Sequence, residues 1–250
     1  MTVSHEPAKP PDRRADAPAR ASVIIPTHNR SGILSRVLGC YGTQTEPVER
    51  FELVVVDDGS TDDTPRLFQA LRPAEPGVDG NLGRYRDRVL EYRWGWLTPR
   101  DDENMFVDRG RVFVRYLRIR KSGRSAARNA GIHAAAFPLI VFADDDIFVE
   151  PDFLSKHLAA HRSGKDLVVM GRVIHTGSLE HPFSARWKLR DINTAFLSTG
   201  NASVRRDLLL AAGAFENLKF ELDALRAAWR LAQLEYSYTE IRAPIDGVVS

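Results

Sequence analysis

The alternation of two kinds of segment most limits the folds that this chain can form. Short, mainly apolar runs of strand length, such as Glu52–Val56 and Leu139–Ala143, alternate with longer stretches in which apolar residues recur at helical spacing. Continuous apolar content is typical of strands that are buried on both faces. Strands that alternate with helices predict an α/β fold with a mostly parallel sheet flanked by helices.

The same pattern assigns elements as far as residue 212. We predict strands at Ser22–Pro26, Glu52–Val56, Val112–Ile119, Leu139–Ala143 and Asp166–Ile174. We predict helices from Ser31 or Gly32 to Gly42, from a cap at Asp62 or Asp63 through Leu67, Phe68 and Leu71, and at Arg124–Ala136, Pro151–His161 and Val204–Ala212. The stretch 72–111 breaks the rhythm, and we interpret it as an insertion because it is long for a loop.

Composition narrows the class of protein. The chain has 250 residues, of which 43% are hydrophobic, and this is enough for one good-sized core. Its formal net charge of +2 does not demand nucleic acid as a partner. One cysteine, Cys40, excludes an intramolecular disulfide, and its place on an apolar helix face indicates a core residue.

Residues 1–20 are rich in Pro, Ala, Arg and Asp and lack the apolar centre of a signal peptide. They predict a disordered tail. No apolar run approaches the length of a membrane-spanning helix. We therefore expect a cytoplasmic protein without a transmembrane segment, compatible with peripheral association at the inner face of the membrane.

Three carboxylates, Asp144, Asp145 and Asp146, directly follow the predicted strand Leu139–Ala143. Carboxylates this close repel one another unless a cation or a polar ligand compensates them. Mg²⁺ is usually held by one or two carboxylates together with substrate phosphates. The triplet therefore suggests a metal–phosphate site, and the alternative is an acidic corner that caps a following helix.

Two further predicted strands end in polar residues, at Pro26–Arg30 and at Asp57–Ser60. The carboxyl ends of parallel strands meet at one rim of a sheet, where α/β proteins bind ligands. Arg30 and the pair Arg124 and Arg128 add guanidinium groups that can clamp phosphate. Together these side chains suit a nucleoside diphosphate held by a metal.

The segments that carry these residues resemble the successive motifs of family 2 glycosyltransferases, which have the GT-A nucleotide-diphospho-sugar transferase fold. The matching segments are 22–30, 54–62, 125–131 and 141–146, while 199–207 with 212–215 resembles the later acceptor-side segment. They occur in family order over residues 21–216. A nucleotidyltransferase-like α/β domain would share the chemistry but not this set of motifs.

The resemblance implies an activity: metal-dependent transfer of a sugar, with inversion, from a nucleotide-diphosphate donor of the UDP, GDP or dTDP type. The acceptor would be a glycan, a lipid-linked molecule or a small molecule. Thr27 and Asp58 would contact the base and ribose of the donor, and Pro26 and Asp57 would shape and support the turns that carry them. Asn29 and Arg30 belong to the same nucleotide-binding rim.

The resemblance also implies roles on the later segments. Arg124, Arg128 and Asn129 would lie near the base or the diphosphate, and the alternative for Arg128 is a salt bridge to an acidic turn. Asp146 would bind Mn²⁺ or Mg²⁺, and Asp144 would bind the metal or the ribose. Asp145 would share either of these two roles. Gly200 and Asn201 would line the sugar or acceptor pocket.

The resemblance breaks after Glu216. Inverting transfer needs a general base within hydrogen-bond reach of the acceptor hydroxyl, and the Glu-Asp pair that supplies it in the family does not follow here. Glu221 and Asp223 are weak candidates. Instead, residues 218–236 show a heptad seam that is typical of a coiled-coil or hairpin helix.

The last residues, 234–250, resemble the exit from the helical hairpin of membrane-fusion, or periplasmic adaptor, proteins, with Asp246–Gly247 as a hairpin turn that has no second half and leaves an unpaired strand. We therefore expect a chimera: a transferase domain at 21–216 without its C-terminal part, joined to a helix and short β segment at 217–250. An unusual native helix that closes the transferase is the alternative. Two alternative functions remain, which are non-catalytic binding of a nucleotide sugar and coiled-coil interaction with a partner. A further alternative is a fusion product that has no function.

Overall fold

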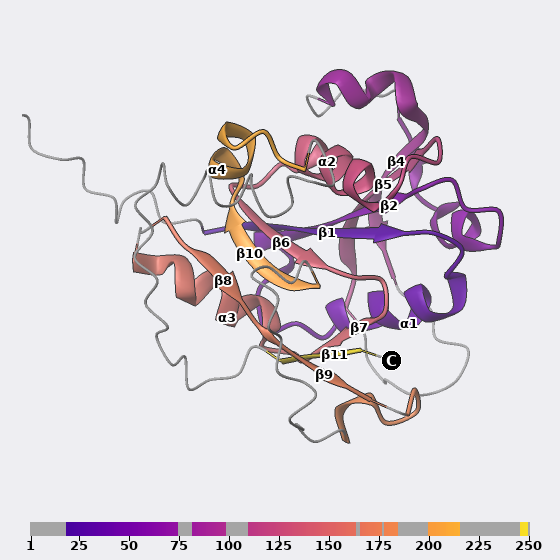
Figure 1. Ribbon diagram of the computed structural model, residues 1–250. Coiled ribbons are helices and arrows are strands. Elements are labelled where there is room, and N and C mark those ends of the chain that lie inside the picture. Colours follow the sequence, from indigo (N-terminus) through magenta and orange to yellow (C-terminus); the bar gives the residue numbers. More distant parts are fainter. Residues whose placement is uncertain are drawn as a thin grey trace, which may run out of the picture.

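A long twisted sheet with a parallel centre organises the chain (Figure 1). The computed structural model describes residues 19–74, 82–98, 110–163, 166–176, 178–184, 200–215 and 246–249. The sheet has eight strands in the order β3-β4-β5-β2-β1-β6-β10-β8. Their bounds are Arg72–Pro73 (β3), Val89–Leu97 (β4), Val112–Ile119 (β5), Phe51–Asp57 (β2), Ala21–Thr27 (β1), Leu139–Ala143 (β6), Asn201–Arg205 (β10) and Val168–Met170 (β8).

The four central strands, β5, β2, β1 and β6, pair in parallel, and the outer strands on both sides are antiparallel. All four were predicted from short, mainly apolar runs, and β1, β2 and β6 are buried along their whole length. The predicted α/β architecture, a mostly parallel sheet with flanking helices, is confirmed.

Helices cover both faces of this sheet (Figure 1). On one face lie α2 (Arg124–Ala134), α4 (Arg206–Ala211) and the 3₁₀ helix η3 (Gly83–Arg88), and on the other lie α1 (Ser31–Tyr41) and α3 (Phe153–Ala160). Short 3₁₀ turns complete the set: η1 (Val48–Arg50), η2 (Thr64–Phe68), η4 (His161–Ser163) and η5 (Pro182–Ser184). Cys40 on α1 is buried in the core, as predicted.

Three predicted elements are corrected by the structure. The single strand Asp166–Ile174 is two strands, β8 and β9 (Arg172–His175), which belong to different sheets and separate at Gly171. The helix Val204–Ala212 begins only at Arg206, because residues 201–205 form β10 against β6. The helix after Asp62 is the 3₁₀ turn η2, whose start is held by Asp62 Oδ1 accepting from the Thr64 N–H at 2.9 Å.

The stretch 72–111, interpreted as an insertion, contributes ordered structure where it is described. Its strand β4 pairs antiparallel with β5 and extends the sheet. Tyr92 on β4 and Tyr85 on η3 are buried in the core beside α2. This part of the insertion therefore belongs to the domain core.

A second, three-stranded sheet in the order β7-β11-β9 lies beside the face covered by α1 and α3 (Figure 1). It consists of β7 (Ile147–Val149), β9 and β11 (Asp246–Val249). The expectation that Asp246–Gly247 is a hairpin turn beside an unpaired strand is therefore wrong: β11 pairs antiparallel with β7 and parallel with β9. Strand β11 therefore lies between β7 and β9 in this sheet.

The predicted heptad seam at 218–236, with Glu221 and Asp223, lies outside the described residues. Within the described part of the chain, the helices are too short or too polar to cross a bilayer.

Candidate functional site

A cleft of about 420 Å³ opens at the carboxyl ends of β1, β2 and β6, within the volume range of small-molecule sites. The ladder between β1 and β6 ends at the pair Ile24 and Phe142, whereas β1 stays paired with β2 up to Thr27 and Asp57. The two strands therefore diverge ahead of Pro26. This is also the point where the strand order turns from β2 to β6 about β1, the usual ligand position in an open α/β sheet.

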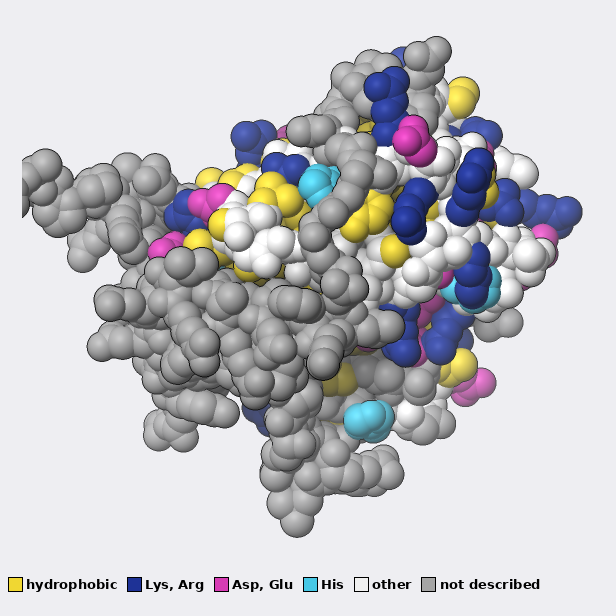
Figure 2. Space-filling view, turned by 45° about the horizontal axis from the view of Figure 1, so that its top comes forward, with side chains coloured by type: hydrophobic (Ala, Val, Ile, Leu, Met, Phe, Trp, Pro, Cys, Tyr) yellow, Lys and Arg dark blue, Asp and Glu magenta, His cyan; other side chains and the backbone are white. Residues whose placement is uncertain are grey.

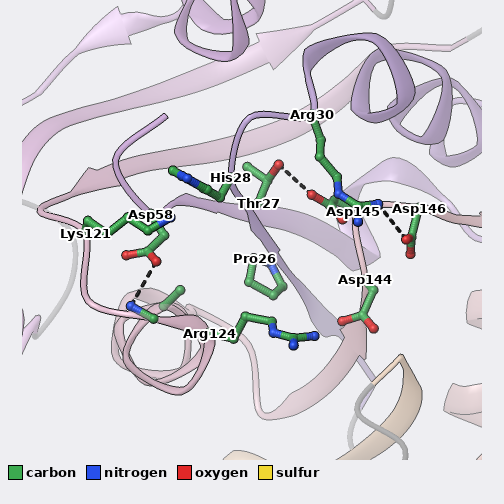
Figure 3. A pocket seen from close by; sticks show the side chains of 12 residues that line it. Pro26, Thr27, His28, Arg30, Asp58, Lys121, Arg124, Asp144, Asp145 and Asp146 are labelled. Atoms are coloured by element: carbon green, nitrogen blue, oxygen red, sulfur yellow. Dashed lines mark hydrogen bonds and ion pairs between the residues drawn. The ribbon is translucent and has the colours of Figure 1, made fainter. Parts of the chain in front are cut away.

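The three carboxylates after β6 enter the cleft in different directions (Figure 3). Asp145 Oδ2 accepts from Thr27 Oγ1 at 2.7 Å, and Asp146 Oδ2 accepts from Arg30 Nη1 at 2.7 Å. Asp144 Oδ1 accepts from Arg128 Nη2 at 2.9 Å. Each carboxylate thus has its own partner, which relieves the repulsion that the sequence implied.

The environment of Asp145 differs from that of its neighbours. Burial raises the pKa of the Asp145 carboxyl to about 6, against the Thr27 hydrogen bond and the charge of Arg30, which lower it. Asp146 and Asp144 have side chains that are 18% and 34% exposed. These two carboxylates are therefore the more accessible to a cation entering the cleft.

The turn after β2 supplies the opposite wall. Asp57 is fully buried and supports the turn, since Oδ1 accepts from the Ser60 N–H at 2.7 Å and Oδ2 from the Tyr116 hydroxyl at 2.7 Å. Asp58 lines the cleft and accepts from the backbone N–H groups of Ser122 and Gly123 at 2.6 and 2.9 Å. A carboxylate has about four acceptor positions, so Asp58 keeps capacity for a ligand.

Basic side chains complete the lining. Lys121 and Arg124 are exposed, line the cleft, and have no ion-pair partner among the described residues. Figure 2 shows Lys and Arg side chains gathered over one side of the described surface. The cleft therefore combines acceptor groups for hydroxyl and N–H donors with positive charge for an anion.

The structure brings most of the proposed site residues together. The cleft is lined by Pro26, Thr27, Arg30, Asp58, Arg124, Asp144, Asp145 and Asp146. Arg128, four residues after Arg124 and on the same face of α2, reaches the cleft through its ion pair with Asp144, which was the alternative for this residue. Asn29 holds the adjoining turn, with φ 55° and its Oδ1 accepting from the Thr61 N–H at 2.7 Å.

Three proposed residues do not themselves line the cleft. The side chain of Asn129 donates to the Tyr85 hydroxyl at 2.8 Å and accepts from the Phe215 N–H at 2.7 Å, so it joins α2 to two other segments. Asn201 is fully buried against α3, and Gly200 lies beside Asp144. None of the three is among the described residues that line the cleft.

Besides Gly123 and Ala127, sequence reasoning missed two lining residues with polar side chains, His28 and Lys121. His28 lies between the matched residues Thr27 and Asn29, and its buried Nδ1 has no hydrogen-bond partner among the described residues. Lys121 follows β5, the fourth parallel strand. Lys121 could have been predicted, because the carboxyl end of β5 lies on the same rim of the sheet as the ends of β1, β2 and β6.

Comparison with known proteins agrees with this geometry. The family described as Glycosyl transferase family 2 matches residues 22–98 and 102–211. Validoxylamine A glucosyltransferase of Streptomyces hygroscopicus subsp. jinggangensis is 33% identical over 141 residues, which are 56% of this chain and 25% of that protein. This chain therefore spans about a quarter of the length of that relative.

Two solved structures share the fold. TarS 1-349 of S. aureus in complex with UDP has a TM-score of 0.54 at 18% identity, over 92% of this chain and 58% of that one. The mannosyltransferase PcManGT of Pyrobaculum calidifontis, in complex with GDP-Man and Mn²⁺, has a TM-score of 0.51 at 18% identity, over 85% of this chain and 52% of that one.

Proposed function

Because the chain belongs to glycosyl transferase family 2, we propose that its cleft binds a nucleoside diphosphate sugar together with Mn²⁺ or Mg²⁺ and that the chain transfers the sugar with inversion to an acceptor hydroxyl. The observation that carries the proposal is the cleft itself. It combines three carboxylates after β6, the Asp58 carboxylate after β2 and the cations Lys121 and Arg124. The related folds were solved with UDP and with GDP-Man and Mn²⁺.

The donor set fits a divalent cation that takes part of its coordination from the ligand. Carboxylate oxygens are the ligands that Mg²⁺ and Mn²⁺ prefer. Among the described residues, no group of three or more His, Cys, Asp or Glu side chains could hold a metal ion by itself. Asp146 and Asp144 would therefore supply one or two ligands and the diphosphate others, a common arrangement for Mg²⁺. The bound cation would neutralise the charge of the departing nucleoside diphosphate.

The protein side chains divide the remaining work. Asp58 and Thr27 would accept hydrogen bonds from the nucleoside. The Thr27 hydroxyl already donates to Asp145, and the backbone N–H groups of Ser122 and Gly123 hold the Asp58 carboxylate in place. Arg124 and Lys121 would bind the diphosphate oxygens, since guanidinium and ammonium groups form charge-assisted hydrogen bonds with phosphate. The candidates for the general base, Glu221 and Asp223, lie outside the described residues, so the described cleft accounts for the donor side.

Thermal melting of the full chain tests this function. With Mn²⁺ and UDP, GDP or dTDP at about 100 times the Kd, binding should stabilise the fold by about 2.7 kcal/mol, which raises the melting temperature by several degrees. Asp146→Ala should abolish the rise. No rise with any of the three nucleotides would contradict donor binding. If a nucleotide does raise the melting temperature, transfer assays on a panel of its sugar conjugates would identify the sugar.

A further inference from the structure

Four polar side chains form a buried network between α3 and the strand β10. They are His157 on α3, His161 on η4, and Asn201 and Ser203 on β10, and all four are fully buried. His157 Nδ1 lies 2.8 Å from Ser203 Oγ, and His157 Nε2 lies 2.9 Å from Asn201 Oδ1. His161 Nε2 lies 3.0 Å from the same Ser203 Oγ. We call these four residues the polar network.

The partners settle the direction of the hydrogen bonds. Asn201 Nδ2 donates to the Arg172 carbonyl at 3.1 Å, so Asn201 Oδ1 accepts from His157 Nε2–H. A neutral imidazole then accepts at Nδ1, and the Ser203 hydroxyl must donate to it. Ser203 Oγ in turn accepts from His161 Nε2–H. The bonds therefore run in one direction from His161 to Asn201, and removing His157 interrupts them.

Asn201 locks the beginning of β10 in place. Besides its side-chain bonds, its carbonyl accepts from the Gly171 N–H at 2.9 Å. A Cβ at Gly171 would lie 2.2 Å from Asn201 Nδ2, so only glycine leaves room for this side chain. The polar network thus joins α3, the break between β8 and β9, and β10 at one residue.

The beginning of β10 faces the cleft carboxylate Asp144. Asn201 pairs with Ala143 on β6, so the preceding residue, Gly200, comes beside the residue that follows Ala143. A Cβ at Gly200 would lie 3.2 Å from Asp144 Oδ2 and 2.9 Å from Ile147 Cδ1. On its other oxygen, Asp144 is held by Arg128 at 2.9 Å. Asp144 is therefore confined between the Arg128 guanidinium and the Gly200 backbone.

We propose that His157 is a positioning residue: through Asn201 it fixes Gly200 against Asp144 and so sets the direction in which the Asp144 carboxylate faces the cleft. The inference rests on the proposed function in one respect, which is that Asp144 contacts the cation or the donor. It adds a role for α3, from which none of the described cleft-lining residues comes. It also assigns Asn201 a supporting position instead of a place in the pocket wall.

Titration calorimetry on the full chain tests the proposal, with UDP, GDP and dTDP in Mn²⁺ and again in EDTA. His157→Leu should weaken the Mn²⁺-dependent binding by about tenfold, the loss typical when a supporting partner of a metal ligand is removed, and should change binding in EDTA much less. His157→Gln, which keeps an N–H donor for Asn201, should restore most of the affinity. Gly200→Ala should weaken Mn²⁺-dependent binding as well, because its Cβ crowds Asp144.

The matched control is Ser22→Ala, which removes a buried hydroxyl that bonds Glu52 at the other end of the sheet. It should lower stability without changing either affinity. If His157→Leu lowers the melting temperature and leaves the Mn²⁺-dependent affinity of the folded protein unchanged, the polar network is only structural and the proposal is wrong, while donor binding stands. If the unaltered chain binds none of the nucleotides, donor binding itself is wrong and the positioning role falls with it.

Discussion

Two acidic sites lie at opposite ends of the same parallel strands and differ in how completely the protein satisfies them. Near the start of β2, Glu52 is almost wholly buried: Oε1 accepts from Ser22 Oγ and from the Ala136 N–H, both at 2.7 Å, and Oε2 from Arg115 Nε at 2.7 Å. At the other end, Asp144 and Asp146 are partly exposed, and each is held by one arginine.

The difference distinguishes a structural carboxylate from one available to a ligand. Glu52 has its neutralising charge and its donors within the fold, so further binding would gain little. The carboxylates after β6 have accessible acceptor positions and open onto a cleft that also carries Lys121 and Arg124. The number of acidic residues in a site is therefore less informative than the capacity that the fold leaves unused.

The largest expected loss of stability comes from the Glu52 site, whose carboxylate is fully satisfied within the fold. Glu52→Leu leaves the Arg115 guanidinium without its buried partner, and loss of one member of a buried pair typically costs about 3–5 kcal/mol. Denaturant unfolding measures the change. The double variant Glu52→Leu with Arg115→Met should recover part of the loss.

At the partly exposed carboxylates after β6, the corresponding loss of unfolding free energy should be small. Asp146→Leu removes the partner of Arg30, which is 48% exposed, and half-exposed pairs contribute about 0–1 kcal/mol. Equal losses of unfolding free energy for Glu52→Leu and Asp146→Leu would contradict the distinction between the two sites.

Another prediction concerns the polar network, which is buried and hydrogen-bonded like the Glu52 site but carries no charge. Burial lowers the pKa values of His157 and His161 to about 4, from an ordinary 6.5. Between these values the unfolded chain binds protons that the folded chain does not. Above pH 6.5 the two histidines should therefore not lower the free energy of unfolding. Between pH 6.5 and pH 4 the free energy of unfolding should fall as the pH falls, by up to about 1.4 kcal/mol per pH unit for each histidine.

Denaturant unfolding at several pH values follows this change. Other groups also titrate in the window, so the comparison is with His157→Gln, whose slope should be shallower. Parallel slopes for the two proteins would show that His157 does not contribute.

The smallest expected effect concerns the affinity of the carboxylates after β6 for a cation. Arg30 Nη1 bonds Asp146 Oδ2 and lies 3.9 Å from Asp145 Oδ1, where its charge competes with a cation for the same oxygens. Arg30→Gln should raise the affinity for Mn²⁺ alone by up to about fivefold, since pairs with an exposed partner are worth about 1 kcal/mol or less. Titration of Mn²⁺ followed by electron paramagnetic resonance measures it. A weaker affinity would mean that Arg30 supports the cation site.

The sequence predicted the parts of the fold that depend on local pattern. Strands β1, β2, β5 and β6 were predicted because their runs are short and mainly apolar. The common rim was predicted because parallel strands end at one edge of a sheet. Strand β10 was missed because its alternate residues Asn201 and Ser203 are polar yet buried against α3. Their burial is decided by partners more than forty positions away in sequence, which a local pattern does not contain.

The same limit explains the site residues. Thr27, Asp58 and Asp144 were found because strand ends determine their position. Asn129 was placed near the donor because segment 125–131 resembles a family motif. It follows Arg128 on the same helix, and successive helix residues face different directions, so its side chain bonds Tyr85 and Phe215 instead. Pairing of β11 with β7 and β9 was also beyond prediction, because its partners lie far away along the chain.

The most direct test of the donor site is equilibrium binding of UDP, GDP and dTDP to the full chain by calorimetry, in Mn²⁺ and in EDTA. We expect that at least one nucleotide binds, that EDTA weakens its binding, and that Asp58→Asn weakens its binding in both conditions. A chain that binds none of them, or whose Asp58→Asn and Asp146→Ala variants bind as well as the unaltered protein, would contradict the assignment of this cleft.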